Sequence, residues 1–254
     1  MKAQVVLTSS ESKRLLAKAV VQMDSVKKAM KKGKILIARG TTNAFVVEEL
    51  TGRKMEKATF TAGYISPAGL SGNPKIPKPI VLVDGQSREA LEVYGDDVVK
   101  DMVPGDLIIK GANAIGPDGI PGLLCARMPT STGGTLGKFM ITAMTRGIEV
   151  IIPVGLEKMI PVSVLVAAKE ICSSPIDQAH GIPCSLIPMF GTVVTEVEAV
   201  KSLSGAEAVP ISAGGVDGAE GSITLLIKGS DVEVKKALDI IAKIKGEPPV
   251  RWPK

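Results

Sequence analysis

The chain has 254 residues, a formal net charge of +5 and only one histidine. This length suffices for one large domain, or for a main domain with a smaller companion, around a well-buried core. Hydrophobic residues make up 45% of the chain but aromatic residues only 3%. We therefore expect a core of aliphatic side chains, which is typical of parallel strands covered by helices and indicates an α/β fold.

Cysteine usage and hydropathy indicate the cellular compartment of the protein. Cys125, Cys172 and Cys184 are odd in number and lack Cys-x-x-Cys spacing, which argues against a disulfide framework and against a metal cluster. The apolar run Val5–Leu7 is shorter than a signal-peptide core. Charged residues such as Glu149 interrupt the longer apolar stretches, so no membrane span is expected. These features predict a cytoplasmic protein with no membrane partner.

The basic charge raises the question of nucleic-acid binding. Two Tyr, one Trp and four Phe offer few platforms on which bases could stack. The densest basic group, Lys27, Lys28, Lys31 and Lys32, falls at the end of a predicted helix, where cations complement the helix dipole. We therefore expect a solvated basic surface and disfavour a nucleic-acid partner.

The first elements follow from hydrophobic periodicity. A short strand precedes a helix capped by Ser9 or Ser10 and ended by Gly33, then a buried strand at 34–38 and a helix at 44–50. Apolar residues recur at helical spacing on one face of the first helix: Leu15, Leu16, Ala19, Val20, Met23, Val26 and Met30.

The middle of the chain alternates strands with helices. The segment 66–79 is rich in Gly and Pro, so an irregular excursion or a mobile lid is expected there. Apolar strands are predicted at 79–83, 106–109 and 149–154. A helix from Thr135 to Gly147 has a predicted apolar face of Leu136, Phe139, Met140, Ala143 and Met144. This rhythm predicts a Rossmann-like, doubly wound and mostly parallel sheet over residues 1–183.

The rhythm changes after residue 183, where strand, helix, two strands and helix follow one another. Thr195 with Glu198, and Ser230 with Glu233, have the spacing of capping boxes that open the two helices. We expect a smaller ferredoxin-like α+β unit over 184–254, with a loose tail after Gly246.

The turn between the strand at 34–38 and the next helix is the first candidate site. Gly40 would let the backbone approach a ligand closely, while Thr41, Thr42 and Asn43 add hydroxyl and amide donors at a helix N-terminus, a geometry that collects phosphate. The alternative is that Thr and Asn only cap the helix. The turn matches neither a Walker A loop nor a Gly-x-Gly-x-x-Gly fingerprint.

A second loop follows the strand at 106–109. Lys110, Gly111 and Asn113 would bind a phosphate, a sugar hydroxyl or a carbonyl there, and Asp118 is the candidate acid or base. The alternative for Asp118 is an ordinary turn, because Pro117-Asp118-Gly119 has turn chemistry of its own.

A third loop opens the helix after residue 133. Thr132, Gly133, Gly134 and Thr135 present backbone N–H groups and hydroxyls, and Lys138 lies in the first turn, where the helix dipole disfavours a cation. An anion nearby would explain that lysine, and a solvated side chain is the alternative.

Two further residues have chemistry of their own. His180 has no second histidine with which to build a triad or a metal site, so it is interpreted as structural or exposed. The cysteines lie in apolar contexts and are expected to be buried small hydrophobes, although Cys125 falls between two candidate loops.

The segments Gly33–Asn43, Asp106–Gly119 and Gly133–Lys158 together resemble the superfamily of ribose-5-phosphate isomerase A, glucosamine-6-phosphate deaminase and CoA-transferase-like proteins. The resemblance covers about the first two thirds of the chain and implies a metabolite site at the three loops. Where isomerases of this superfamily carry Gly-Ala-Asp, this chain has Asn113, which accepts no proton at neutral pH.

Three hypotheses follow. The first is an isomerase-like or transferase-like enzyme that acts on a sugar phosphate, a CoA ester or a similar anionic metabolite, without a resident cofactor. The second is a non-catalytic sensor or regulatory subunit that self-associates through apolar helix faces into a homo-oligomer. The third, a nucleic-acid binder, rests on charge alone.

Overall fold

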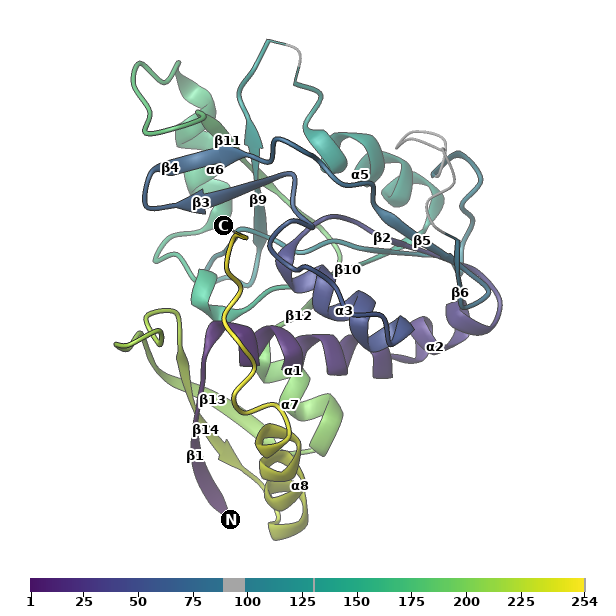
Figure 1. Cartoon of the computed structure of the whole chain (residues 1–254), viewed down its shortest axis with the longest axis vertical. Helices are drawn as coiled ribbons and strands as arrows, with labels where there is room; N and C mark the ends of the chain where they lie inside the picture. Colours follow the sequence, from purple (N-terminus) through teal and green to yellow (C-terminus); the bar gives the residue numbers. More distant parts are fainter. Residues whose placement is uncertain (89–98, 130, 254) are drawn as a thin grey trace.

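The computed structural model describes residues 1–88, 99–129 and 131–253 (Figure 1). Its centre is a six-stranded mixed sheet. In spatial order the strands are β12 (Thr192–Val194), β10 (Glu149–Pro153), β7 (Leu107–Ile109), β2 (Lys34–Ile37), β5 (Ile80–Val83) and β6 (Gln86–Arg88). The first four strands are mutually parallel. Their carboxyl ends therefore meet at one edge of the sheet.

The strand predicted at 79–83 extends this sheet differently from the expected parallel arrangement. β5 runs antiparallel to β2 and returns directly into β6 through a two-residue turn. Asp84 and Gly85 have φ values of 49° and 72°, as a hairpin turn with two left-handed residues requires. The Asp-Gly pair thus directs the chain back on itself, so that β5 and β6 form an antiparallel hairpin.

Helices cover both faces of the sheet. Ile35 and Ile37 of β2 contribute to the core shared with α1 (Ser9–Gln22), α3 (Thr41–Thr51) and α7 (Glu196–Ser204), whereas Leu36 contributes to the core under α5 (Gly134–Arg146). This alternation follows from the two-residue period of a strand. The predicted inward face of α5 is confirmed at four of its positions, but Met144 is exposed.

A smaller antiparallel sheet combines the two ends of the chain (Figure 1). β14 (Ile223–Lys228) lies between β1 (Lys2–Leu7) and β13 (Glu207–Ala213), and α8 (Asp231–Ala242) packs against β14. The boundary expected after residue 183 does not separate the sheets, because β12 belongs to the six-stranded sheet and β1 to the small one. Pairing between such distant segments leaves no mark on local composition.

The remaining described strands form a third sheet and a hairpin. β11 (Cys184–Pro188), β9 (Pro121–Ala126) and β8 (Ala114–Ile115) form an antiparallel sheet, with η1 (Leu156–Lys158) and α6 (Val164–Ser173) packed beside it. The segment predicted to be irregular contains a hairpin of β3 (Gly63–Ser66) and β4 (Gly69–Gly72). Leu70 of β4 exchanges backbone hydrogen bonds with His180 and Ile182, so this hairpin is fixed to a distant loop.

The first predicted helix is divided in two. Met23 has extended backbone angles between α1 and α2 (Asp24–Lys31), and the cap of α1 is Thr8, in a capping box with Glu11. This corrects the expected caps at Ser9 and Ser10, although Thr8-Ser9-Ser10-Glu11 carries the capping-box spacing. The two predicted C-terminal capping boxes are confirmed.

The tail after Gly246 is more ordered than expected. Trp252 stacks on Tyr64 of β3 with ring centroids 4.2 Å apart, and Glu247 accepts hydrogen bonds from Arg14 of α1. The tail thereby connects the β3–β4 hairpin to α1. Over the residues described, none of the helices combines the length and the apolar character needed to span a bilayer.

Candidate functional site

Three cationic residues follow three neighbouring parallel strands at the edge where their carboxyl ends meet. Arg39 comes after β2, Lys110 directly follows β7, and Lys158 ends η1, which follows β10. The carboxyl ends of parallel strands are where ligands gather in open α/β sheets. This edge, with the three cations, is the candidate site and is called the cationic edge below.

The two lysines of the cationic edge donate to backbone carbonyl groups. Lys110 Nζ lies 3.3 Å from the carbonyl oxygens of both Arg39 and Gly111, and Lys158 Nζ lies 2.8 Å from that of Ala112. Neither lysine forms an ion pair with any residue that the structure describes. Carbonyl dipoles satisfy donors without neutralising their charge, so the edge keeps an excess of positive charge.

Burial and neighbouring cations lower the pKa of both lysines. Burial lowers the pKa of Lys110 to about 8, and the charges of Lys158 and Arg39 act in the same direction. Burial also lowers the pKa of Lys158 to about 8, with a further contribution from Lys13. A lysine that is costly to charge regains its charge when an anion binds beside it.

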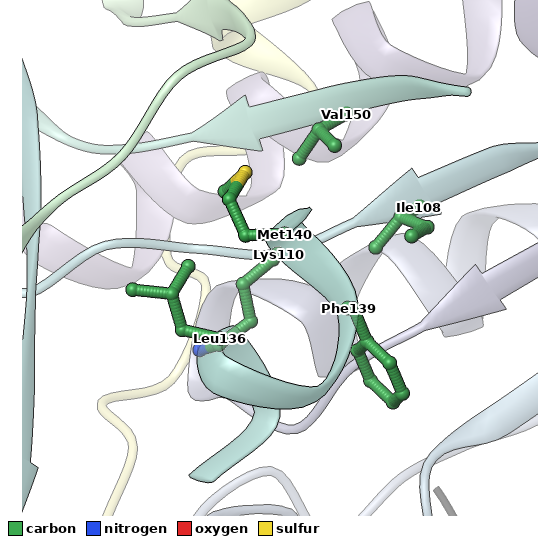
Figure 2. Close-up of a pocket in the computed structure, with 6 residues that line it drawn as sticks. All are labelled: Ile108, Lys110, Leu136, Phe139, Met140 and Val150. Atoms are coloured by element: carbon green, nitrogen blue, oxygen red, sulfur yellow. The ribbon is translucent and has the colours of Figure 1, made fainter. Parts of the chain in front are cut away.

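A thiol and an apolar crevice adjoin Lys110. Cys125 Sγ on β9 donates to the carbonyl oxygen of Gly133 at 3.5 Å, and burial raises the pKa of this thiol although Lys110 opposes the shift. Figure 2 shows the stem of Lys110 in a crevice, with its amine beside Leu136 at the first turn of α5. The crevice has room for about one water molecule.

The turn at 40–43 lies at this edge, but Asn43 does not offer its amide to a ligand as expected. Asn43 is fully buried, and its Nδ2 donates to the carbonyl oxygens of Ala38 at 2.6 Å and Ile109 at 3.2 Å. It therefore holds the ends of β2 and β7 together. No side-chain cap forms at Gly40, the N-cap of α3, so the capping interpretation of this turn is wrong as well. Thr42 is also buried, and Thr41 is partly exposed.

The loop after Lys110 divides into two parts. Gly111 packs against the α3 turn, whereas the side-chain oxygen of Asn113 accepts from the N–H of Leu124 at 3.1 Å. Asp118 is exposed, accepts from the N–H of Ile120 at 3.2 Å, and has its pKa lowered by a hydrogen bond from Ser163. These contacts are those of an ordinary turn beside α6. A carboxyl with a lowered pKa is a poor proton donor at neutral pH.

The loop at 131–138 approaches the cationic edge through its backbone. A Cβ at Gly137 would overlap the carbonyl oxygen of Thr132, so the loop can fold over the first turn of α5 only because residue 137 is glycine. Thr132, Gly134 and Lys138 are exposed, and Gly133 contacts Cys125. The side chain of Thr135 lies outside the described residues.

The structure adds residues that the sequence motifs did not indicate. Lys158 is one, and beside it Lys13 of α1 pairs with Glu157 at 2.6 Å. Glu196, directly after the cap that follows β12, is fully buried and accepts from the N–H of Leu156 at 2.9 Å, and burial raises its pKa. The charged residues in Gly155-Leu156-Glu157-Lys158, directly after a buried strand, were the available signal.

The remaining candidates lie elsewhere or have other roles. His180 is exposed, and its carbonyl oxygen accepts from the N–H of Leu70 at 3.3 Å. Cys184 is buried as expected, whereas Cys172 is exposed, because α6 presents that side to solvent.

Comparison of the chain with protein-family models, with curated proteins and with solved structures finds no match. The functional argument therefore depends on the geometry and charge of the cationic edge.

Proposed function

We propose that this protein binds an anionic, phosphate-bearing small metabolite at the cationic edge, on a sheet of Rossmann-like type. The observation that carries the proposal is the convergence of Arg39, Lys110 and Lys158 at the ends of three adjacent parallel strands. The charges of Lys158 and Arg39 repel that of Lys110, and an anion bound at this edge would offset this repulsion. A phosphoryl group has the charge and the acceptor oxygens to do so.

The backbone supports the same ligand class. The first turn of α3 has no side-chain cap, and neither has the first turn of α5. Both helices therefore direct N–H groups and the positive ends of their dipoles toward the loops around Lys110. Sugar phosphates and CoA esters, the classes that the superfamily resemblance implies, both carry phosphate groups.

The experiment is a calorimetric titration and thermal-shift screen with pyrophosphate, sugar phosphates and CoA esters. A ligand that binds only the folded protein raises the melting temperature. We expect saturable binding in the wild type and at least about tenfold weaker binding in Lys110→Met and in Lys158→Met.

Lys236→Met is the matched control, because it removes the same charge from an exposed position on α8. It should bind like the wild type. If Lys236→Met weakens binding as much as Lys110→Met does, the attraction is due to net charge and the site proposal is wrong.

A non-catalytic sensor or regulatory subunit is the second candidate function. The observation that favours it is the turn geometry of Asp118 together with the contact of Asn113 with β9, which leaves the 111–119 loop without a positioned acid or base. Saturable binding without product, followed by mass spectrometry of each bound ligand, would support it. Formation of a product from any of these ligands would exclude it.

A further inference from the structure

Lys110 differs from the other two cations of the edge in its surroundings. Arg39 Nε donates to the carbonyl oxygen of Pro77, and the carboxylates of Glu157 and Glu196 partly offset the charge of Lys158. Among the described residues, the charged neighbours that act on Lys110 are Lys158 and Arg39, and the one group that opposes them is the Cys125 thiol. Within the described residues, carboxylates thus compensate Lys110 less than they compensate Lys158.

The environment of Lys110 is one that makes an amine nucleophilic. A lysine attacks a carbonyl carbon only in its neutral form, and proteins favour that form by an apolar wall or by a neighbouring cation. Lys110 has both, because its stem lines the crevice with Leu136 and Phe139 and its amine lies near Lys158. A pKa of about 8 leaves about a tenth of the amine neutral at pH 7, against well under one part in about a thousand for an ordinary lysine.

We propose that Lys110 forms an imine with an aldehyde or ketone ligand whose phosphate group is held by Arg39 and Lys158. This inference rests on the proposed function and adds a carbonyl group to the ligand class. The neutral Nζ bonds to the carbonyl carbon, and the carbonyl oxygen leaves as water with the two amine hydrogens. A carbon–nitrogen double bond remains, and no oxidant or reductant is consumed.

The geometry supports attack by Lys110 in particular. Its Nζ is held by two carbonyl oxygens at 3.3 Å each, which are at the long end of hydrogen bonding and release the amine at little cost. Lys158 has a single shorter bond of 2.8 Å. Lys158 is therefore assigned to anion binding.

Pyridoxal 5′-phosphate, an aldehyde that carries a phosphate, is the probe, and borohydride reduces any imine to a stable amine. Reduced adducts are located by peptide mass spectrometry. In the wild type we expect Lys110 to be labelled about tenfold faster than exposed lysines such as Lys236. Pyrophosphate should suppress this labelling, because it competes for the same anion subsite. Predominant labelling of Lys158 or of exposed lysines would overturn the proposal.

Lys110→Arg separates this inference from the proposed function, because arginine keeps the charge but forms no stable imine. We expect this variant to bind pyrophosphate within about threefold of the wild type and to give no adduct at position 110. If the wild type binds pyrophosphate but gives no Lys110 adduct, the imine proposal fails and the anion site stands. If it binds neither pyrophosphate nor the probe, both proposals fail.

Discussion

The cationic edge and a second buried charge cluster differ in the groups that surround their charged side chains. In the second cluster, Arg14 of α1 pairs with Glu48 at 2.5 Å, with Glu49 at 3.0 Å and with Glu247 at 2.9 Å. Lys57 adds a pair with Glu48 at 2.9 Å. Each charge in this Arg14 cluster has an opposite charge beside it, whereas the lysines of the cationic edge have carbonyl groups.

The pKa values show the same contrast. Burial would raise the pKa of Glu48, but the N–H of Met55 and the charges of Arg14 and Lys57 lower it to about 2. At the cationic edge, burial and like charges act together on Lys110. A cluster in which every charge is paired stabilises the fold, whereas lysines without paired carboxylates can bind an anion. The following predictions test this distinction, from the largest expected effect to the smallest.

Arg14→Met should have the largest effect, since it leaves the buried carboxylate of Glu48 and the partly buried carboxylate of Glu247 without their main partner. We expect the free energy of unfolding to fall by about 3 to 5 kcal/mol, measured by urea denaturation. Lys18→Met is the control: Lys18 is about one-third exposed and pairs with Glu49 at 3.3 Å, so its removal should cost less than about 1 kcal/mol. Equal losses in the two variants would contradict a special role for the buried cluster.

Acid should weaken the Arg14 cluster through Glu48. The pKa of this carboxyl is lowered from 4.5 to about 2, so its contribution is complete above about pH 4.5 and is lost as the pH falls toward 2. We expect about 3 kcal/mol of stability to disappear over this interval. Glu48→Gln should be less stable than the wild type at neutral pH and should lose less on acidification. Parallel pH profiles for the two proteins would assign the loss to other carboxylates.

Alkali should weaken the cationic edge instead. Sulfate is a suitable probe because its charge is constant between about pH 7 and about pH 9, while Lys110 and Lys158, with pKa values of about 8, lose their protons over that interval. We expect the affinity for sulfate to fall about tenfold, measured by calorimetry at constant ionic strength. Lys110→Arg should lose less. A flat profile in the wild type would show that neither lysine contacts the anion.

The smallest predicted effect is opposite in sign to the first. Lys110→Met should raise the free energy of unfolding by about 1 kcal/mol, because it removes a partly buried cation next to Lys158. The same substitution should reduce the stabilisation that pyrophosphate gives to the wild type, by up to about 1.4 kcal/mol for tenfold weaker binding. Greater stability with weaker binding is typical of a functional site. If Lys110→Met is less stable than the wild type in the absence of ligand, Lys110 stabilises the fold as Arg14 does.

The sequence predicted the fold locally better than it predicted the site. Strands such as β2 and β7 are continuous apolar runs, and the capping boxes at Thr195 and Ser230 are local signals, so both were found. The antiparallel placement of β5 and the position of β1 beside β14 depend on partners far along the chain. No local pattern encodes such pairing.

For the site, the sequence located the edge but not the roles of its side chains. Lys110 and Gly111 were expected there and lie there. Asn43 has a side-chain amide that could contact a ligand. It is buried, however, and its hydrogen bonds to Ala38 and Ile109 link two strands instead. Lys158 was missed because it lies outside the three candidate loops, and only the parallel order of β7 and β10 brings it to Lys110.

The pairing of β1 with β14 has a consequence for synthesis of the protein. Lys2 lies opposite Lys228 in that sheet, and the Arg14 cluster closes only with Glu247. On the ribosome, α1 therefore emerges long before the strand and the carboxylate that complete its surroundings. Contacts between such distant segments form late and slow folding. Until translation reaches the tail, Arg14 lacks one of its carboxylate partners and β1 lacks its neighbour, and an unpaired strand edge is prone to aggregation.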